Sequence, residues 1–203
     1  MAVETLFVLV EEPSMEIALE ALLPKLLRPE IAVEIRQFQC KDELLARLPN
    51  RLAGYAEWLP ATAVILVLVD RDDDDCKALK QKLDTIAHKA GLTTKSRPGA
   101  AGFQVINRVA IEELEAWFFG DWPAICAAYP KLDVSVPKRA GLRDPDAIKG
   151  GTWEALEREL HRKGYFKTGL RKLELARTVA PLMAPHHNRS GSFVSLRTAL
   201  AAL

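Results

Sequence analysis

The sequence VILVLVDRDDDD, residues 64–75, decides the predicted fold more than any other part of the chain. Its first six residues are aliphatic and mostly β-branched, which is typical of a strand buried on both faces of a parallel sheet. Ligands of open α/β sheets bind beyond the carboxyl ends of such strands. Asp70 and Asp72 are therefore predicted to lie at a functional edge, with both side chains on one side if the strand continues through them.

The acidic run after this strand has more than one interpretation. Crowded carboxylates repel one another unless a cation joins them, and a hard divalent cation prefers oxygen ligands. Asp73, Asp74 and Asp75 are instead expected to be solvent-exposed residues at the start of a helix over 76–90, where they complement its dipole. An EF-hand loop is disfavoured because Asp75 and Gln81 stand where Gly and Glu are required. The chain also lacks the P-loop motif that would accompany a Walker B strand.

Composition limits the class of protein. The chain has 203 residues, of which 49% are hydrophobic and 27% are charged, as is ordinary for a soluble globular protein. Its apolar stretches are too short to span a membrane and its N-terminus does not resemble a secretion signal, so a cytoplasmic location is predicted. The three widely spaced cysteines predict neither a disulfide framework nor a zinc site.

Charge is unevenly distributed along the chain. Residues 1–137 hold 15 basic and 21 acidic residues, whereas residues 138–203 hold 13 basic and 6 acidic residues. This asymmetry favours an acidic part able to bind a metal beside a basic part able to bind phosphate, although a basic surface without a partner fits nearly as well.

Strands alternate with helices over the first two-thirds of the chain, which predicts an α/β fold with a mostly parallel sheet flanked by helices and a C-terminal helical extension. We expect an α/β domain over 1–130, a loop or lid over 131–151, and a basic helical extension over 152–203 packed on the same domain. Strands are predicted at 6–10, 32–38, 64–69 and within 103–111. Helices are predicted at 15–27 with a kink or break near Pro24, at 42–48, irregularly within 49–60 after a turn, and at 76–90, 112–119, 152–163, 170–180 and 193–203.

Glu11 ends the first predicted strand as Asp70 ends the third. Carboxylates at adjacent strand ends can meet at one metal although they are far apart in the sequence. Mg²⁺ typically takes one or two protein carboxylates together with water and phosphate oxygens. This composition is expected of phosphoryl-transfer or phosphodiester-cleaving sites, in which a metal polarises phosphate and supplies hydroxide.

The segment after the fourth strand adds further candidates. Glu112 and Glu115 stand at i and i+3 of the predicted helix and so occupy neighbouring faces. Glu115 is predicted either to be a further metal ligand or to hold a basic side chain, and a purely structural role is equally open. Trp117 is expected in the core rather than as a platform for a base.

The C-terminal part carries the candidate phosphate contacts. Arg189 precedes the last predicted helix, and a helix N-terminus beside an arginine suits a phosphate group. A solvated face, or internal pairing with the acidic motifs, is an equally good interpretation of the basic residues. A cluster that could neutralise a nucleic-acid backbone comprises Lys167, Arg171, Lys172 and Arg177.

Four sequence blocks in order resemble a known family. FVLVEEPSME (7–16) followed by ILVLVDRDD (65–73) resembles the TOPRIM domain of topoisomerases, primases and overcoming-lysogenization-defect nucleases. EELEAWFFGD (112–121) and KTGLRK (167–172) with NRSGSF (188–193) extend the resemblance to a bacterial TOPRIM-like family long described as of unknown function. Its members lie beside genes of ABC-type ATPases, and one branch supplies the nuclease effector of the PARIS anti-phage system.

The resemblance implies roles for particular residues. Glu11 would be a general base or metal-proximal carboxylate, and Asp70 and Asp72 would be metal ligands for Mg²⁺ or Mn²⁺. Two positions depart from the family pattern: Glu12 replaces the usual glycine, and Met15 stands where a second glutamate is common.

Two functions from different classes follow. The first is a metal-dependent TOPRIM-like nuclease that cleaves RNA or DNA in anti-phage defence with an ABC-type ATPase partner. The second is a non-catalytic, ATPase-associated module with a degenerate acidic site. A phosphatase of the haloacid dehalogenase type is disfavoured, because its nucleophilic aspartate normally ends the first strand. The oligomeric state stays open, a homodimer included.

Overall fold

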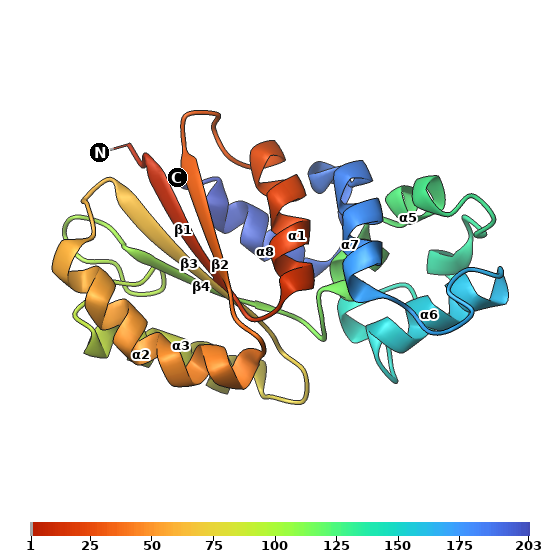
Figure 1. Ribbon diagram of the computed structural model, residues 1–203, viewed down its shortest axis with the longest axis horizontal. Coiled ribbons are helices and arrows are strands. Elements are labelled where there is room, and N and C mark those ends of the chain that lie inside the picture. Colours follow the sequence, from red (N-terminus) through yellow and green to blue (C-terminus); the bar gives the residue numbers. More distant parts are fainter. Residues whose placement is uncertain (1) are drawn as a thin grey trace.

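The computed structural model describes residues 2–203, which form an α/β fold around one parallel sheet. All neighbouring strands in this part of the chain run parallel, in the order β2-β1-β3-β4 (Figure 1). The predicted parallel sheet is thus confirmed. Its strands are β1 (Thr5–Val10), β2 (Ala32–Gln37), β3 (Ala63–Asp70) and β4 (Val105–Ala110).

Helices cover both faces of the sheet. In Figure 1, α2 and α3 lie on one face and α1 and α8 on the other, while α5, α6 and α7 lie beyond the carboxyl ends of the strands. The helices are α1 (Pro13–Leu22), α2 (Lys41–Trp58), α3 (Cys76–Lys89), α4 (Glu115–Gly120), α5 (Trp122–Ala128), α6 (Thr152–Arg162), α7 (Lys172–Val179) and α8 (Gly191–Leu200). Short 3-10 turns are η1 (Leu23–Lys25), η2 (Val136–Lys138), η3 (Pro145–Ala147), η4 (Ala180–Leu182) and η5 (Pro185–His187).

Alternation along β1 divides the core into two apolar clusters. Phe7 and Leu9 face the cluster beneath α2 and α3, whereas Leu6 and Val8 face the cluster beneath α1. The second cluster continues into the C-terminal helices and includes Phe193. The C-terminal helices therefore share a hydrophobic core with the sheet. Strand β3 is buried along its whole length, as its aliphatic sequence predicts.

One helix is longer than predicted. The turn expected after residue 48 is wrong, because α2 runs without interruption through Pro49. A proline inside a helix removes one hydrogen bond and crowds the preceding turn. Here the proline ring lies on the exposed side, and the opposite side buries an apolar stripe against the sheet. That stripe consists of Leu44, Leu48, Leu52 and Tyr55.

The two edges of the sheet differ. The β4 edge lies against α8, and the Arg108 Nε donates to the Ser195 carbonyl at 3.2 Å. The β2 edge is open, since five of its six residues are exposed and the sixth is half-buried. Within residues 2–203, no helix is both long enough and apolar enough to cross a membrane.

Candidate active site

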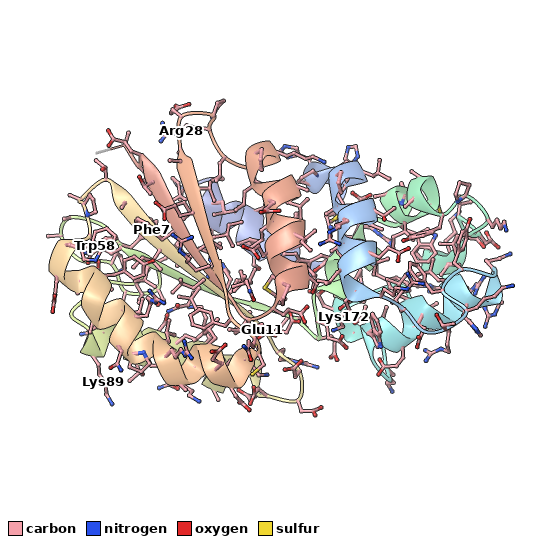
Figure 2. The ribbon with its side chains drawn as sticks, in the orientation of Figure 1. Phe7, Glu11, Arg28, Trp58, Lys89 and Lys172 are labelled. Carbon is pink, nitrogen blue, oxygen red and sulfur yellow. The ribbon has the colours of Figure 1, made fainter. Side chains whose placement is uncertain are left out.

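Glu11 and Asp70 lie together at the carboxyl edge of the sheet. Glu11 follows β1, and Asp70 is the last residue of the adjacent strand β3, where Leu68 pairs with Val10. Both carboxyl groups are almost completely buried. Among the described residues, neither Glu11 Oε2 nor Asp70 Oδ1 has a hydrogen-bond partner. The adjacency of the two strand ends expected from the sequence is confirmed, and both acidic residues line one cavity. Figure 2 shows Glu11 near the carboxyl end of β1.

A third buried carboxylate comes from the segment after β4. Glu115 begins α4, is 0% exposed, and has two side-chain oxygens without a hydrogen-bond partner in residues 2–203. The expectation that Glu112 shares its helix is wrong, because Glu112 precedes α4 and has a φ of 61°. Trp117 is buried as predicted, and its Nε1 donates to Ser192 Oγ at 3.0 Å.

Burial is the main reason why the pKa values of all three carboxyl groups are raised. Burial raises the pKa of Glu11 to about 8, and the charge of Asp72 adds to this effect. Burial also raises the pKa of Asp70 well above its ordinary value, and repulsion from Glu11 and Glu115 raises it further. Burial raises the pKa of Glu115 to about 8 although Lys172 opposes the change. The metal-free site therefore favours carboxyl groups that carry a proton.

Lys172 supplies the nearest compensating charge. It begins α7, and its Nζ lies 3.4 Å from Glu113 Oε2 and 3.8 Å from Glu115 Oε2, over the ring of Trp153. Burial alone would lower the pKa of this amine, but the carboxylates around it, Glu115 foremost, raise it above its ordinary value. In the sequence Lys172 is only one member of a basic cluster. Nothing local separates it from its neighbour Arg171.

Asp72 is placed differently from Asp70. Strand β3 ends at Asp70, so the condition under which both side chains would point to one side is not met. The Asp72 side chain is half exposed and its Oδ2 lies 2.6 Å from Lys41 Nζ. The same amine pairs with Asp74 at 2.8 Å and donates to the Arg71 carbonyl at 3.2 Å. Lys41 therefore fixes the turn that follows β3.

The turns after β3 and β4 have strained backbones and are connected to each other by a hydrogen bond and an ion pair. Asp72 and Glu112 both have positive φ values, 47° and 61°, which residues with a side chain rarely adopt. The Asp72 amide donates to the Glu112 carbonyl at 3.1 Å, and the Arg71 guanidinium pairs with the Glu112 carboxylate. Strain of this kind concentrates at functional sites. Farther along, Asp75 caps α3 by accepting from the Ala78 amide at 2.8 Å, which confirms the predicted helix start.

Glu11 and Asp70 border a cavity of about 320 Å³. Within residues 2–203, no three His, Cys, Asp or Glu side chains are already arranged around one point as metal ligands. The donor set nevertheless fits a hard cation, because Mg²⁺ needs only one or two protein carboxylates beside water and phosphate. Unpartnered oxygens of Glu11 and Asp70 meet that need. The cavity is lined by Glu11, Glu12, Gln39, Cys40, Lys41, Asp42, Asp70, Asp72 and Lys172.

The predicted phosphate contacts lie outside this cavity. Lys167 is exposed between α6 and α7, and Arg171 is exposed and bonded to Glu174 at 3.0 Å. Arg189 borders a separate cavity beside α5. The helix N-terminus next to it is already satisfied by Asp146, whose Oδ2 accepts from the Ser192 amide at 2.7 Å. The structure thus brings Lys172, rather than these three residues, to the carboxylates.

The chain belongs to the family described as a domain of unknown function, DUF4276. The model of this family matches residues 10–201, which is nearly the whole chain. The matched range includes Glu11, Asp70, Glu115 and Lys172. No curated protein and no solved structure matches the chain.

Proposed function

We propose that this protein is a metal-dependent, TOPRIM-like nuclease that cleaves phosphodiesters of RNA or DNA. The observation that supports the proposal best is the set of four buried carboxylate oxygens on Glu11, Asp70 and Glu115 that have no hydrogen-bond partner within residues 2–203. Burying such oxygens costs free energy unless a proton or a cation compensates them. Their position at the carboxyl ends of parallel strands is where α/β proteins bind ligands.

Each residue has a distinct role in this proposal. Glu11 and Asp70 would hold Mg²⁺ or Mn²⁺, with Asp72 and Glu115 as further candidate ligands. When bound, such an ion polarises a phosphoryl oxygen and lowers the pKa of water. Burial raises the pKa of Glu11 to about 8 in the metal-free protein, and a bound cation would favour the ionised carboxylate that can hold the metal or accept a proton. Lys172 offers its positive charge to a phosphate oxygen that enters the cavity.

The biological setting rests on the sequence resemblance. An ABC-type ATPase as partner and a role in anti-phage defence follow from that resemblance, with nucleic acid as the substrate. Co-purification with an ABC-type ATPase from the same genome would support the partner, and an equal yield of complex with an unrelated ATPase would oppose it.

Cleavage by the purified protein tests the proposal directly. Single- and double-stranded RNA and DNA are incubated with wild type, Glu11→Gln, Asp70→Asn and the control Asp73→Asn, in Mg²⁺, Mn²⁺ or EDTA. Asp73 is exposed and lies in the same acidic run. We expect cleavage by wild type and Asp73→Asn in metal alone, and a loss of at least a hundredfold in the other two variants. Equal cleavage by Asp70→Asn, or cleavage in EDTA, would refute the proposal.

A second candidate function is a non-catalytic module that associates with an ATPase. The pairing of Lys172 with Glu113 and Glu115 favours it, because this amine already compensates part of the acidic charge. This alternative predicts no metal-stimulated cleavage of any of these substrates, together with a stable ATPase complex.

A further inference from the structure

A groove runs between the open strand β2 and helix α2, on the face of the sheet covered by α2 and α3. Its volume is about 650 Å³, and it is separate from the cavity at Glu11. Arg36 of β2 lines one side of the groove, and Arg47, Arg51, Tyr55 and Trp58 of α2 line the other. Figure 2 shows Trp58 and Phe7 at a distance from Glu11, toward the other end of the sheet.

Three aromatic rings form a rigid platform in this groove. The ring centroid of Phe7 lies 5.1 Å from that of Tyr55 and 5.6 Å from that of Trp58, and Tyr55 and Trp58 are 5.3 Å apart. Phe7 and Tyr55 are buried, whereas Trp58 is 57% exposed. The two buried rings therefore hold the indole in place while leaving much of it open to solvent. An aromatic surface of this kind can stack against an unpaired base of any sequence.

The groove is positively charged where the cavity at Glu11 is acidic. Its lining contains Arg36, Arg47 and Arg51 but Glu34 as the only carboxylate among the described lining residues. Arg36 pairs with Glu34 and Arg47 pairs with Glu43 on the surface, whereas Arg51 forms no ion pair within residues 2–203. The Glu11 cavity has five acidic and two basic side chains in its lining, an acidic excess that gives no affinity for a polyanion. Affinity for a phosphate backbone has to come from a second surface, and this groove has the complementary charge.

The groove also points toward the carboxylates. Arg47, Arg51 and Trp58 lie on one side of α2, at i, i+4 and i+11. Lys41, at the start of the same helix, borders the Glu11 cavity. At 1.5 Å per residue, Arg47 is roughly 9 Å along the helix from Lys41, and Trp58 is roughly 25 Å from it. A strand lying along α2 would pass from Trp58 to the active-site cavity.

We propose that the groove between β2 and α2 binds single-stranded nucleic acid, with a base stacked on Trp58 and backbone phosphates at Arg36, Arg47 and Arg51. A base can stack on a protein ring only when it has left the stack of a duplex, so the groove selects unpaired strands. The delivery of this strand to Glu11 rests on the proposed nuclease function. The binding itself does not.

Binding in EDTA tests this groove without any cleavage. The full-length protein is titrated into fluorescein-labelled 12-nucleotide RNA and DNA oligonucleotides of mixed sequence, each as a single strand and as a duplex. Fluorescence anisotropy is recorded at several salt concentrations. The variants are Trp58→Ala, Trp58→Phe and Arg51→Ala. The control is Lys89→Ala, an exposed cation at the end of α3 that lies outside the groove lining. Circular dichroism checks that each variant is folded.

We expect tighter binding of single strands than of duplexes. Trp58→Ala should weaken binding by about tenfold, because base stacking on an aromatic ring contributes on the order of 1–3 kcal/mol. Trp58→Phe should retain most of the affinity. Arg51→Ala should reduce the slope of log affinity against log salt concentration by the amount expected for about one phosphate contact. Lys89→Ala should bind as wild type does.

Three results would overturn the proposal: no binding by wild type, duplexes bound as tightly as single strands, or wild-type affinity in both Trp58→Ala and Arg51→Ala. If the groove variants instead abolish a dimer seen by sedimentation and leave oligonucleotide binding intact, the groove pairs copies of this chain. If the protein binds oligonucleotides in the groove but never cleaves them, only the nuclease proposal is refuted. If it cleaves nucleic acid equally well without Trp58 or Arg51, only the proposed role of the groove is refuted.

Discussion

The Nζ of Lys172 lies 3.8 Å from the Oε2 of Glu115, a carboxylate that is 0% exposed and lacks a hydrogen-bond partner among the described residues. The two residues come from α7 and α4 and are far apart in the sequence. Their proximity connects the C-terminal helices to the acidic edge of the sheet. It also means that the free energy of unfolding depends on the charge state of this site.

Replacing Lys172 by Met should destabilise the metal-free protein at pH 8. Removing one member of a fully buried ion pair typically costs 3–5 kcal/mol. Because the Lys172 side chain is 34% exposed, we expect a smaller loss of about 1–2 kcal/mol. Urea unfolding measures this value, and Lys172→Arg is the charge-preserving control. Equal stability of Lys172→Met and wild type would show that the amine does not compensate Glu115.

The metal-free protein should lose stability as pH rises from about 4.5 to 8. Burial raises the pKa of Glu11 from 4.5 to about 8, so in this range the folded state binds more protons than the unfolded state. The free energy of unfolding then falls with rising pH. Thermal unfolding in EDTA across this range measures the slope, and Glu11→Gln should make it shallower. A slope that Glu11→Gln leaves unchanged would mean that Glu11 is ionised in the fold at neutral pH.

Lys41 and Asp72 should have opposite effects on metal affinity. Lys41 holds Asp72 at 2.6 Å and places a positive charge in the lining of the cavity. Lys41→Met should therefore strengthen Mn²⁺ binding by about three- to tenfold, as expected when a partly exposed ion pair worth roughly 1 kcal/mol no longer competes with the metal. Asp72→Asn should weaken Mn²⁺ binding. Equal affinity in both variants and wild type, measured by calorimetry, would exclude Asp72 from the metal site.

Asp146 should anchor the segment between α5 and α6. Its carboxylate accepts from the Ser190 hydroxyl at 2.6 Å and from the Ser192 amide at 2.7 Å, at the start of α8. Asp146→Ala should lower the free energy of unfolding by about 1–2 kcal/mol, as the loss of a helix cap does. Urea unfolding tests this, with the exposed Asp144→Ala as a partial control that removes only a local turn contact. No loss in Asp146→Ala would show that these two contacts do not anchor the segment.

The sheet could be predicted because each strand is marked by the apolar pattern of its own residues. A run such as Val64–Val69 can satisfy its side chains only where both faces are covered, and β3 is buried throughout. The prediction of a turn at Pro49 was wrong for a physical reason. The cost of a proline in a helix arises from neighbouring residues, whereas the compensation comes from packing of the apolar stripe of α2 against the sheet. Local propensity therefore gave the strands more reliably than the length of this helix.

The candidate site could be predicted only in part. Glu11 and Asp70 could be predicted because they stand at the carboxyl ends of two strands that a parallel sheet places side by side. Lys172 could not be singled out, because its partners Glu113 and Glu115 are about sixty residues away in the sequence. The left-handed turn at Glu112 was equally hidden, since it depends on the Arg71 contact from another strand end.

Calorimetric titration of Mn²⁺ into the metal-free protein at pH 8 tests the central claim most directly, namely that Glu11 and Asp70 form a cation site. Wild type and the control Asp73→Asn should bind Mn²⁺ and release protons, because binding favours the ionised carboxylates. Asp70→Asn should show no binding at the same concentrations. Equal binding by wild type and Asp70→Asn, or no binding by wild type, would contradict the claim.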